Sequence, residues 1–564
     1  MDEQPPIPEQ PTPPGGNGAT SFDPLASPSP YEPVHPASRA SRARVTALVL
    51  AVLVLLTGGG TVLLLRASNS TQSLDRFVPD TVAAYVKFSI HPSVQQQRTV
   101  QDLLSRFPSS VRNDVGSKLD DALDKSFKDL NISYRNGIKP WVGSQIAFAV
   151  LAPAGSTSDS PFPSAPNVIG VVALKDAAAA QKALTKIKKA SPKAPAFDIE
   201  GGVAYLGDSQ NSITSFKNAV TSGHTLADSA SYKREHDRAG GDGLVFGYAD
   251  LSKLAGVAPS LRGDILGGSA LTGGTGIVGL SLRAESQGLV VTGHSSLPTS
   301  PAGGKAGTFK ILPTTPDDLL GSVSFFDLGD LVANVLKTLN RGFGLHPAST
   351  NGQQVPGLPQ VTTALQEFQR ALGLNLQKDV LPWLKGELSV IVGPGTNPPI
   401  PNIGIVIEPT NAAALRRTMN ALRTHLAAVL GSGGKVQSDA NGLTVKTPIG
   451  EDIVVRTTPG RVVIATGLPY ANRLLHSSGS NLGGDTIYKA AVDPSKPTVF
   501  QMFVRLDRVR TLVEALFKLN DPSGYDAYER NVQPFVKPLQ ALGIQSTMSG
   551  GSQDFRLIIT IAKP

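Results

Sequence analysis

The chain contains no cysteine among its 564 residues. Disulfide bonds, thiolate metal sites and cysteine nucleophiles are therefore excluded. An exported protein of this composition has to be stabilised by its hydrophobic cores alone. That property suits a bacterial surface better than a eukaryotic secretory route.

The sequence also lacks the short motifs of common hydrolases and metalloenzymes. There is no GxSxG, and the eight histidines show no HxxxH or HExxH spacing that would bring two imidazoles to one metal ion. The GxGxxG pattern at Gly274, Gly276 and Gly279 precedes a strand pattern, so we interpret it as a loop and not as a dinucleotide site. The SxxK spacing from Ser432 to Lys435 lies in a glycine-rich loop. We therefore expect no catalytic, cofactor or metal residues.

Charge is absent from one long stretch, the run from Val45 to Leu65. A helix over this run, rising about 1.5 Å per residue, covers the roughly 30 Å hydrocarbon core of a bilayer. Three arginines precede the run and Arg66 follows it. Because basic flanks stay cytoplasmic, we expect a signal anchor over residues 45–66, with the N-terminus inside and the C-terminal part outside the cell. A cleaved signal peptide is the alternative, but its apolar core is normally only about 7–15 residues long.

Residues 1–44 are dense in proline and small polar residues. Such a composition cannot bury a core, so we expect a disordered cytoplasmic tail. It is either an inert tether or a docking or phosphorylation segment for a cytoplasmic partner. The part after the anchor is long enough for at least two domains. The net charge of +8 is compatible with an anionic envelope polymer or protein as partner, and we expect no nucleic acid.

The exterior part repeats itself about every 240 residues, as four landmarks that recur in the same order. These are Pro79-Asp80 with Pro316-Asp317, Pro140-Trp141 with Pro382-Trp383, Pro166-Asn167 with Pro401-Asn402, and Tyr232-Lys233 with Tyr488-Lys489. A Val-Phe pair follows the last landmark in both halves, at Val245-Phe246 and Val499-Phe500. The pattern predicts two tandem homologous copies, over residues 75–300 and 308–564.

Both copies show strand and helix patterns, which predict the α+β class. Alternating or short apolar runs predict strands over 82–88, 146–151, 168–174, 388–392, 403–407 and 461–465, and closing hairpins over 277–283 with 289–294 and 545–548 with 555–561. Leu415, Met419 and Leu422 form a helical stripe after a predicted cap at Thr410. We expect a mainly antiparallel sheet in each copy, with helices packed on one face.

Few side chains stand out as candidates for chemistry. Glu387 and Glu408 are candidate carboxylates for glycoside hydrolysis, with repeat counterparts near Gln145 and Leu174. Trp141 and Trp383 either line a ligand groove or anchor the core at equivalent helix-to-strand corners. The acidic cluster around Asp124 lacks a calcium-loop pattern and is better explained by pairs with lysines one helical turn away.

Several phrases of the sequence resemble an actinobacterial family of membrane-anchored proteins of unknown function, DUF3352. They run from Phe77 to Ser93, from Lys139 to Pro153, from Gly170 to Leu184 and from Tyr248 to Leu254. The resemblance implies the family's topology and a membrane anchor, and it brings no catalytic residues. We therefore expect a noncatalytic binding or scaffolding protein of the cell envelope. The alternatives are an envelope hydrolase with a site between the repeats and a carrier of lipid or another hydrophobic ligand.

Overall fold

The computed structural model describes residues 73–109, 111–112, 124, 133–151, 167–190, 194–257, 276–296, 306–330, 367, 369–395, 400–430, 435–446, 452–476, 479–549 and 551–563. The predicted tail and the run from Val45 to Leu65 lie outside these residues. Within them, no helix is both long and apolar enough to cross a membrane. The chain divides into a unit over Met1–Leu53 and a unit over Val54–Pro564, and the second unit contains every described element.

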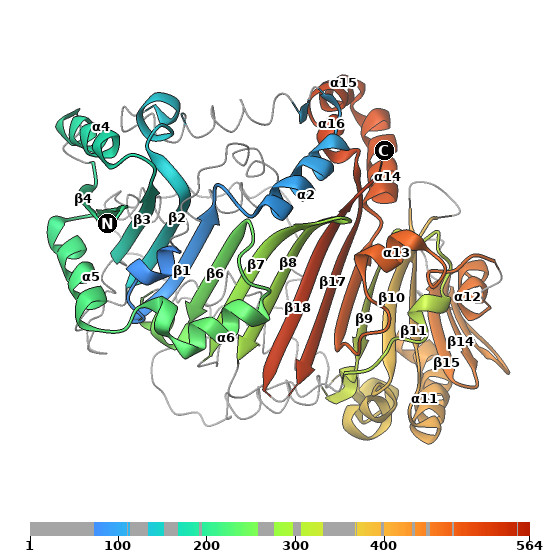
Figure 1. Cartoon of the computed structure of the whole chain (residues 1–564). Helices are drawn as coiled ribbons and strands as arrows, with labels where there is room; N and C mark the ends of the chain where they lie inside the picture. Colours follow the sequence, from blue (N-terminus) through green and yellow to red (C-terminus); the bar gives the residue numbers. More distant parts are fainter. Residues whose placement is uncertain are drawn as a thin grey trace, which may run out of the picture. The chain divides into compact units, whose positions relative to one another are not determined.

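Among the described residues of the second unit, 18 strands form one antiparallel sheet (Figure 1). The first half contributes β1 (Val82–Ser89), β2 (Val142–Leu151), β3 (Asn167–Leu174), β4 (Ala196–Glu200), β5 (Val203–Gly207), β6 (Val245–Asp250), β7 (Ile277–Glu285) and β8 (Gly288–Ser296). The second half contributes β9 (Gly321–Phe326), β10 (Glu387–Gly393), β11 (Asn402–Ile407), β12 (Lys435–Asp439), β13 (Gly442–Lys446), β14 (Ile453–Thr458), β15 (Arg461–Thr466), β16 (Phe500–Val504), β17 (Leu539–Ser549) and β18 (Ser552–Ile561). The α+β class and both predicted hairpins are confirmed.

Helices lie between the strands in sequence. They include α2 (Val94–Ser105), α4 (Ala177–Ala190), α5 (Gln210–Ser222), α6 (Ala230–Arg238), α7 (Leu251–Val257), α11 (Ala412–Leu430), α12 (Leu468–Leu475), α13 (Thr486–Ala491), α14 (Leu506–Asn520), α15 (Pro522–Asn531) and α16 (Gln533–Val536). Short turns of helix are η4 (Leu74–Phe77), η6 (Tyr134–Ile138), η7 (Leu226–Asp228), η9 (Leu312–Thr314), η10 (Leu376–Val380) and η11 (Leu381–Trp383).

The order of strands in one half of the sheet recurs in the other half. From the middle outward the first half runs β8-β7-β6-β1-β2-β3-β5-β4. The second half runs β18-β17-β16-β9-β10-β11-β15-β14-β13-β12. Eight strands therefore correspond, from β8 and β18 to β4 and β14. The second half adds an extra hairpin at its edge.

The two halves join where β8 pairs with β18, and we call this junction the seam. Phe88 and Phe325 are equivalent residues of the two halves, and the strand register can be followed from each of them to the seam. It makes Thr292 and Arg556 equivalent positions, and these two residues lie opposite each other. A pseudo-twofold axis thus passes through this pair. The same register corrects the Val-Phe landmark by one residue, because Val245 and Phe500 are the equivalent positions. Phe246 and Phe500 consequently face opposite sides of the sheet.

Helices cover both faces of the sheet, so the prediction of helices on one face is wrong. Face 1 packs against η4, α5, α6, α12 and α13 through the two largest clusters of buried residues. Face 2 packs against α2, α4 and α11 through three smaller clusters. Neighbouring residues of β3 show the reason, because Val171 belongs to a face 1 cluster and Val172 to a face 2 cluster. A continuous apolar strand of this kind is buried on both sides.

Local sequence signals account for where the helices begin. Ser93, Ser209 and Ser229 cap α2, α5 and α6 through side-chain acceptors. The predicted cap of α11 at Thr410 is wrong by one residue. The Asn411 side chain accepts from Ala414 N, whereas the Thr410 hydroxyl donates to the carbonyl of Pro382. Asparagine is the better cap because its carbonyl reaches the third amide of the first turn.

Candidate functional site

An apolar row crosses face 2 of the sheet. Residues directly opposite each other in an antiparallel ladder project from the same face, so the register traces the row from strand to strand. It consists of Ile146, Phe88, Val245, Leu282, Val291, Leu557, Ile544, Met502, Val323, Val390, Ile405 and Ile464. The row crosses twelve strands without a polar side chain.

Helices contact the row near its sides, and nearly all of its side chains are half-buried. Helix α2 packs on Val245, Leu282 and Val291, and α11 packs on the Val390 end. Between them, most face 2 side chains of β18, β17, β16 and β9 are half-buried. We call these the central patch: Phe555, Leu557, Ile559, Leu542, Ile544, Phe500, Met502, Val504, Val323 and Phe325. Two of its rings, Phe325 and Phe500, lie 5.4 Å apart. The central patch is apolar around one buried hydroxyl, that of Ser546, which lies between Phe500 and Phe555 and accepts from Gln553.

Face 1 carries buried ionisable groups in both halves, among them Lys87 in the first half and Glu387 in the second. Lys87 is only 1% exposed, and its Nζ lies 2.6 Å from Asp242 Oδ1 and 3.3 Å from the Ser73 hydroxyl. His236 Nε2 lies 3.0 Å from the same Asp242 oxygen. Burial alone would raise the pKa of Asp242, but the hydrogen bond to His236 and the charge of Lys87 outweigh it and hold that pKa well below its usual range. The hydrogen bond to Asp242 raises the pKa of His236.

A second buried group lies at the seam. His294, 3% exposed, has Nδ1 2.6 Å from Asp554 Oδ1 and Nε2 3.6 Å from Glu235 Oε2. Glu235 is fully buried, and its Oε1 accepts hydrogen bonds from Ser296 and from Arg234. Helix α6 supplies Glu235 and His236, whereas β8 and β18 supply the pair at the seam.

The second half has small or apolar residues at the equivalent positions. Ser324 replaces Lys87 and bonds to the hydroxyl of Ser389 at 2.8 Å. Ala491 replaces Glu235, and Ile558 replaces His294, both in the face 1 core. Burying charge costs several kcal/mol per ion unless it is compensated. The fold itself therefore does not require the ionisable groups of the first half.

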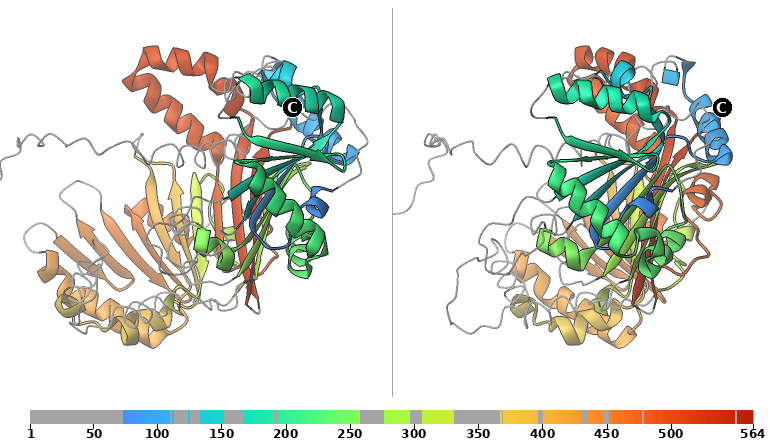
Figure 2. Two further views of the ribbon diagram at one scale, coloured as in Figure 1. Left: turned by 90° about the vertical axis from the view of Figure 1, so that its left-hand side faces the viewer. Right: turned by 60° about the vertical axis from the view of Figure 1, so that its left-hand side comes forward.

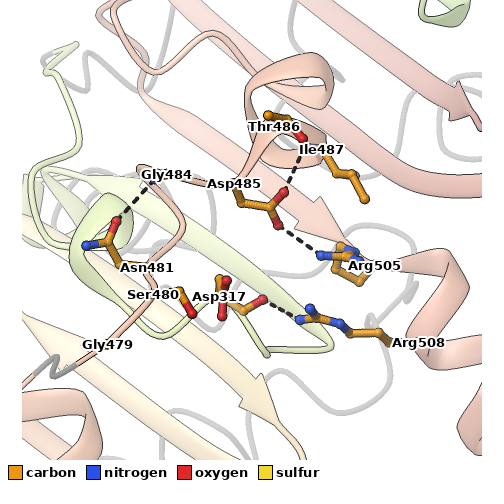
Figure 3. Close-up of a pocket in the computed structure, with 10 residues that line it drawn as sticks. All are labelled: Asp317, Gly479, Ser480, Asn481, Gly484, Asp485, Thr486, Ile487, Arg505 and Arg508. Carbon is orange, nitrogen blue, oxygen red and sulfur yellow. Dashed lines mark hydrogen bonds and ion pairs between the residues drawn. The ribbon is translucent and has the colours of Figure 1, made fainter.

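A pocket of about 520 Å³ opens at a corner of the second half, where the loop before α13 meets the first turn of α14 (Figure 3). Arg505 donates to both carboxylate oxygens of Asp507 and to Asp485, at 2.8–2.9 Å. Arg508 donates to the carbonyls of Asp317 and Leu319. Lys253 makes the matching contact to the carbonyl of Asp80 in the first half, 3.0 Å away. In both halves, a basic side chain thus bonds the backbone just before the first strand at the same corner of the sheet.

Both tryptophans are core anchors. Trp141 and Trp383 are buried, and each precedes the second strand of its half. The indole of Trp141 donates to the carbonyl of Gly137, and that of Trp383 donates to the Thr418 hydroxyl. Each ring also belongs to a face 2 cluster, beneath α4 or α11. Neither lines the pocket described above.

The candidate carboxylates do not form an acid–base pair. Glu387 is fully buried, and it accepts the backbone N–H groups of Lys310, Ile311 and Leu312 at 2.6–2.8 Å. Burial raises its pKa, against the lowering effect of these bonds. Its counterpart Gln145 accepts from Leu74 N in the same way. Glu387 therefore holds η9 against the sheet, as Gln145 holds η4, and Glu408 follows β11 without a catalytic partner among the described residues.

The other residues singled out in the sequence either have structural roles or lie outside the described residues. Gly279 lies in β7, where an added Cβ would come 2.7 Å from the carbonyl of Glu235, so it permits close packing of α6. Asp124 accepts from Ser133 and from the backbone of Arg135, whereas its predicted lysine partner lies outside the described residues, as do Gly274 and Ser432. Among the described residues, no three His, Cys, Asp or Glu side chains are placed to hold a metal ion. Sequence reasoning missed the central patch and the seam group, because only strand pairing brings their residues together.

The chain belongs to the family described as protein of unknown function (DUF3352), whose profile matches residues 46–203 and 277–560. No curated protein matches it. Two solved structures are similar over part of the chain. "Structure of crystal form III of TP0453" has 9% identity and a TM-score of 0.23, and "Structure of crystal form I of TP0453" has 10% and 0.22. Each covers 45% of this chain and 93% of the other.

Proposed function

We propose that this protein is a noncatalytic component of the cell envelope that binds lipid acyl chains on the central patch. In this proposal, the run from Val45 to Leu65 anchors the chain in the cell membrane, with residues 1–44 inside and the duplicated body outside. The observation that carries the proposal is the uninterrupted apolar row across face 2. Apolar area removed from water contributes roughly 25 cal/mol per Å², so covering such a surface favours an apolar ligand.

The dimensions of the patch support an acyl chain over a small polar ligand. Strands lie about 4.8 Å apart, so the four strands from β18 to β9 offer a width of about 14 Å. That width is comparable with one leaflet of a roughly 30 Å hydrocarbon core. The proposed anchor would also keep the body close to its ligand, because the anchor lies in membrane lipid.

A hydrolase is less well supported. The side chains that line the pocket include no histidine, and its arginines are already bonded to carboxylates or to carbonyls. Buried His294 and Lys87 lie on the face opposite the central patch, within the core beneath α6. Scaffolding of an anionic polymer would rest on the exposed lysines Lys182, Lys186 and Lys189, which line a hollow along α4.

Photocrosslinking tests the proposal. The full chain is reconstituted in vesicles that contain a phosphatidylcholine with a photoactivatable acyl chain, and crosslinked peptides are identified by mass spectrometry. We expect crosslinks in β16, β17 and β18 as well as in the anchor. The double variant Met502→Gln, Ile544→Gln should lose the crosslinks of the body and keep those of the anchor.

Thr547→Gln is the matched control, because Thr547 is a half-buried residue of β17 that faces the other side of the sheet. It should leave every crosslink in place. Crosslinks restricted to the anchor in the unmodified chain would refute lipid binding by the central patch.

A further inference from the structure

Helix α4 carries three unpaired lysines along its outer side. Lys182, Lys186 and Lys189 are exposed, and none of them has an ion-pair or hydrogen-bond partner among the described residues. At about 100° per residue, the three lie within about 60° of one another, opposite the buried Ala180 and Leu184. Figure 2 shows α4, in blue-green, at the outer surface of the first half. We call these three lysines the lysine stripe.

The charge around the lysine stripe is strongly unbalanced. Residues 167–197 contain six lysines and one aspartate, a net charge of +5 out of +8 for the whole chain. That aspartate, Asp176, accepts a backbone N–H of the first turn of α4. Asp198 and Glu200 of the neighbouring β4 both pair with Lys217. Like charges one turn apart destabilise a helix, so the lysine stripe costs stability unless an anion binds to it.

The equivalent helix of the second half shows that the fold does not need the lysine stripe. Helix α11 follows β11 as α4 follows β3, and Asn411 caps α11 as Asp176 caps α4. Counting from these caps, the equivalents of the lysine stripe are Arg417, Ala421 and Thr424. Only Arg417 is charged, and it pairs with Asp379 at 2.9 Å. Packing on face 2 therefore explains neither the number of these lysines nor their lack of partners.

The residues beside the lysine stripe indicate a partner that is charged and not apolar. Ala178, Gln181 and Thr185 border the hollow along α4 together with the three lysines. A helix that binds in a membrane surface carries Trp, Phe or Leu on the side that enters the lipid, and this side of α4 has none. A lysine ammonium is a point charge, so it binds carboxylate and phosphate alike without the forked geometry of arginine.

The spacing of the lysines suits a linear polymer. With a rise of about 1.5 Å per residue, they follow one another at about 6 Å and about 4.5 Å along the helix axis. A polymer with an anionic group about every 5 Å can meet all three at once, because the first contact raises the effective concentration for the next.

We infer that the lysine stripe of α4 binds a linear polyanion whose repeating groups are carboxylates or phosphates. This surface lies on the first half of the sheet, apart from the central patch. Its occupation depends neither on the acyl-chain site nor on the anchor of the proposed function, so it would be a second binding activity of the same chain.

Binding of polygalacturonate, which carries one carboxylate per sugar, tests the inference. The full chain is kept in a nonionic detergent, and the anisotropy of the fluorescently labelled polymer is measured. Long-chain polyphosphate provides the phosphate form of the test, and fully methyl-esterified polygalacturonate is the uncharged control. We expect both polyanions to bind, and to bind more weakly as the salt concentration rises from about 50 to about 200 mM, because salt screens exposed charges.

The triple variant Lys182→Gln, Lys186→Gln, Lys189→Gln should weaken the binding about tenfold, since it removes three exposed ion pairs. The matched control is Lys435→Gln, Lys489→Gln, Lys496→Gln, which removes the same net charge at three exposed lysines of the second half. It should leave the binding unchanged. The double variant Met502→Gln, Ile544→Gln alters the central patch and should also bind both polyanions normally. Thermal unfolding checks that each variant is folded.

Four outcomes would overturn the inference. Equal weakening by the two triple variants would mean that net charge alone sets the affinity. Equal binding of the methyl-esterified polymer would mean that the anionic groups are not recognised. Failure of the unmodified chain to bind either polyanion would exclude this class of partner. Binding to phosphatidylglycerol vesicles, with neither polyanion bound, would assign the lysine stripe to a membrane surface instead.

Discussion

His294 and Asp554 face each other across the seam, with Nδ1 of the imidazole 2.6 Å from Oδ1 of the carboxylate. The pseudo-twofold axis relates this pair to Ile558 and Val290, which are both fully buried in the face 1 core. One end of the seam is thus apolar, and the other is ionisable. The difference arises from single residues at matched positions, so it can be reversed by substitution.

The seam group consists of Glu235, His294 and Asp554. The protein should keep its stability only when all three residues are replaced together. His294→Ile alone leaves Glu235 buried without its imidazole, and we expect a loss of roughly 3 kcal/mol in the free energy of unfolding. The triple variant Glu235→Ala, His294→Ile, Asp554→Val puts at each position the residue of its equivalent position, Ala491, Ile558 and Val290, and should recover most of that loss. Urea unfolding of the two variants measures both values. A triple variant less stable than the single one would contradict this account.

The group of Lys87, Asp242 and His236 predicts a pH dependence. The pKa of His236 is raised, so its stabilising effect is present below its unfolded pKa near 6.5 and is lost as the pH rises through the folded value. The pKa of Asp242 is lowered, so its effect is present above its unfolded pKa near 3.8 and is lost as the pH falls. Between about pH 4 and pH 6.5 both contributions are present.

We expect His236→Gln to cost roughly 1–2 kcal/mol at pH 5.5 and less at pH 9, because the bond to a charged partner is lost. Thermal unfolding at the two pH values measures the difference. His224→Gln, at an exposed histidine between α5 and η7, serves as the control. An equal cost of His236→Gln at both pH values would show that the protonated imidazole does not contribute.

Glu387 should be essential for the position of η9. Glu387→Gln leaves one acceptor oxygen for three N–H groups and brings a donor toward at least one of them. We expect a loss of about 1–3 kcal/mol in the free energy of unfolding, from the unsatisfied buried donor. Hydrogen exchange at Lys310, Ile311 and Leu312 locates the effect. Unchanged exchange at these amides would show that the carboxylate is not their acceptor.

The close packing of α6 on β7 should depend on Gly279. Gly279→Ala brings a methyl group to within 2.7 Å of the Glu235 carbonyl, so we expect a cost of about 1–3 kcal/mol. Gly247→Ala is the matched control in β6, because its methyl would meet only Leu280 Cβ at 3.9 Å. Thermal unfolding of both variants gives the comparison. Equal costs would mean that strand propensity, and not the helix contact, sets the effect.

The strands could be predicted from sequence because their apolar residues alternate or cluster. The run Val168 to Leu174 and the hairpin around Ser286 appear nearly where predicted. The side of the sheet on which helices pack could not be predicted in the same way. Ala180 and Leu184 of α4 give a helical stripe, but only the connection from β3 places that stripe on face 2.

The candidate site was less accessible to sequence reasoning. Asp554 lies 260 residues from His294 in the chain, and the contact depends on the register of β8 with β18. The apolar row likewise needs the register of every pair from β2 to β15. Glu387 was recognised as unusual, but its role depends on three amides of residues 310–312, which no side-chain pattern reveals.

The antiparallel seam between equivalent strands has a consequence for assembly. An edge strand that pairs with its own counterpart about a twofold axis is the interface of a symmetric dimer. In this chain the covalent link holds both partners together, so their association does not depend on protein concentration. Neither strand is left as an open edge to recruit other chains. A dimer of identical chains would also repeat each substitution on both sides of its axis, whereas here one side could acquire buried charges while the other kept valine and isoleucine.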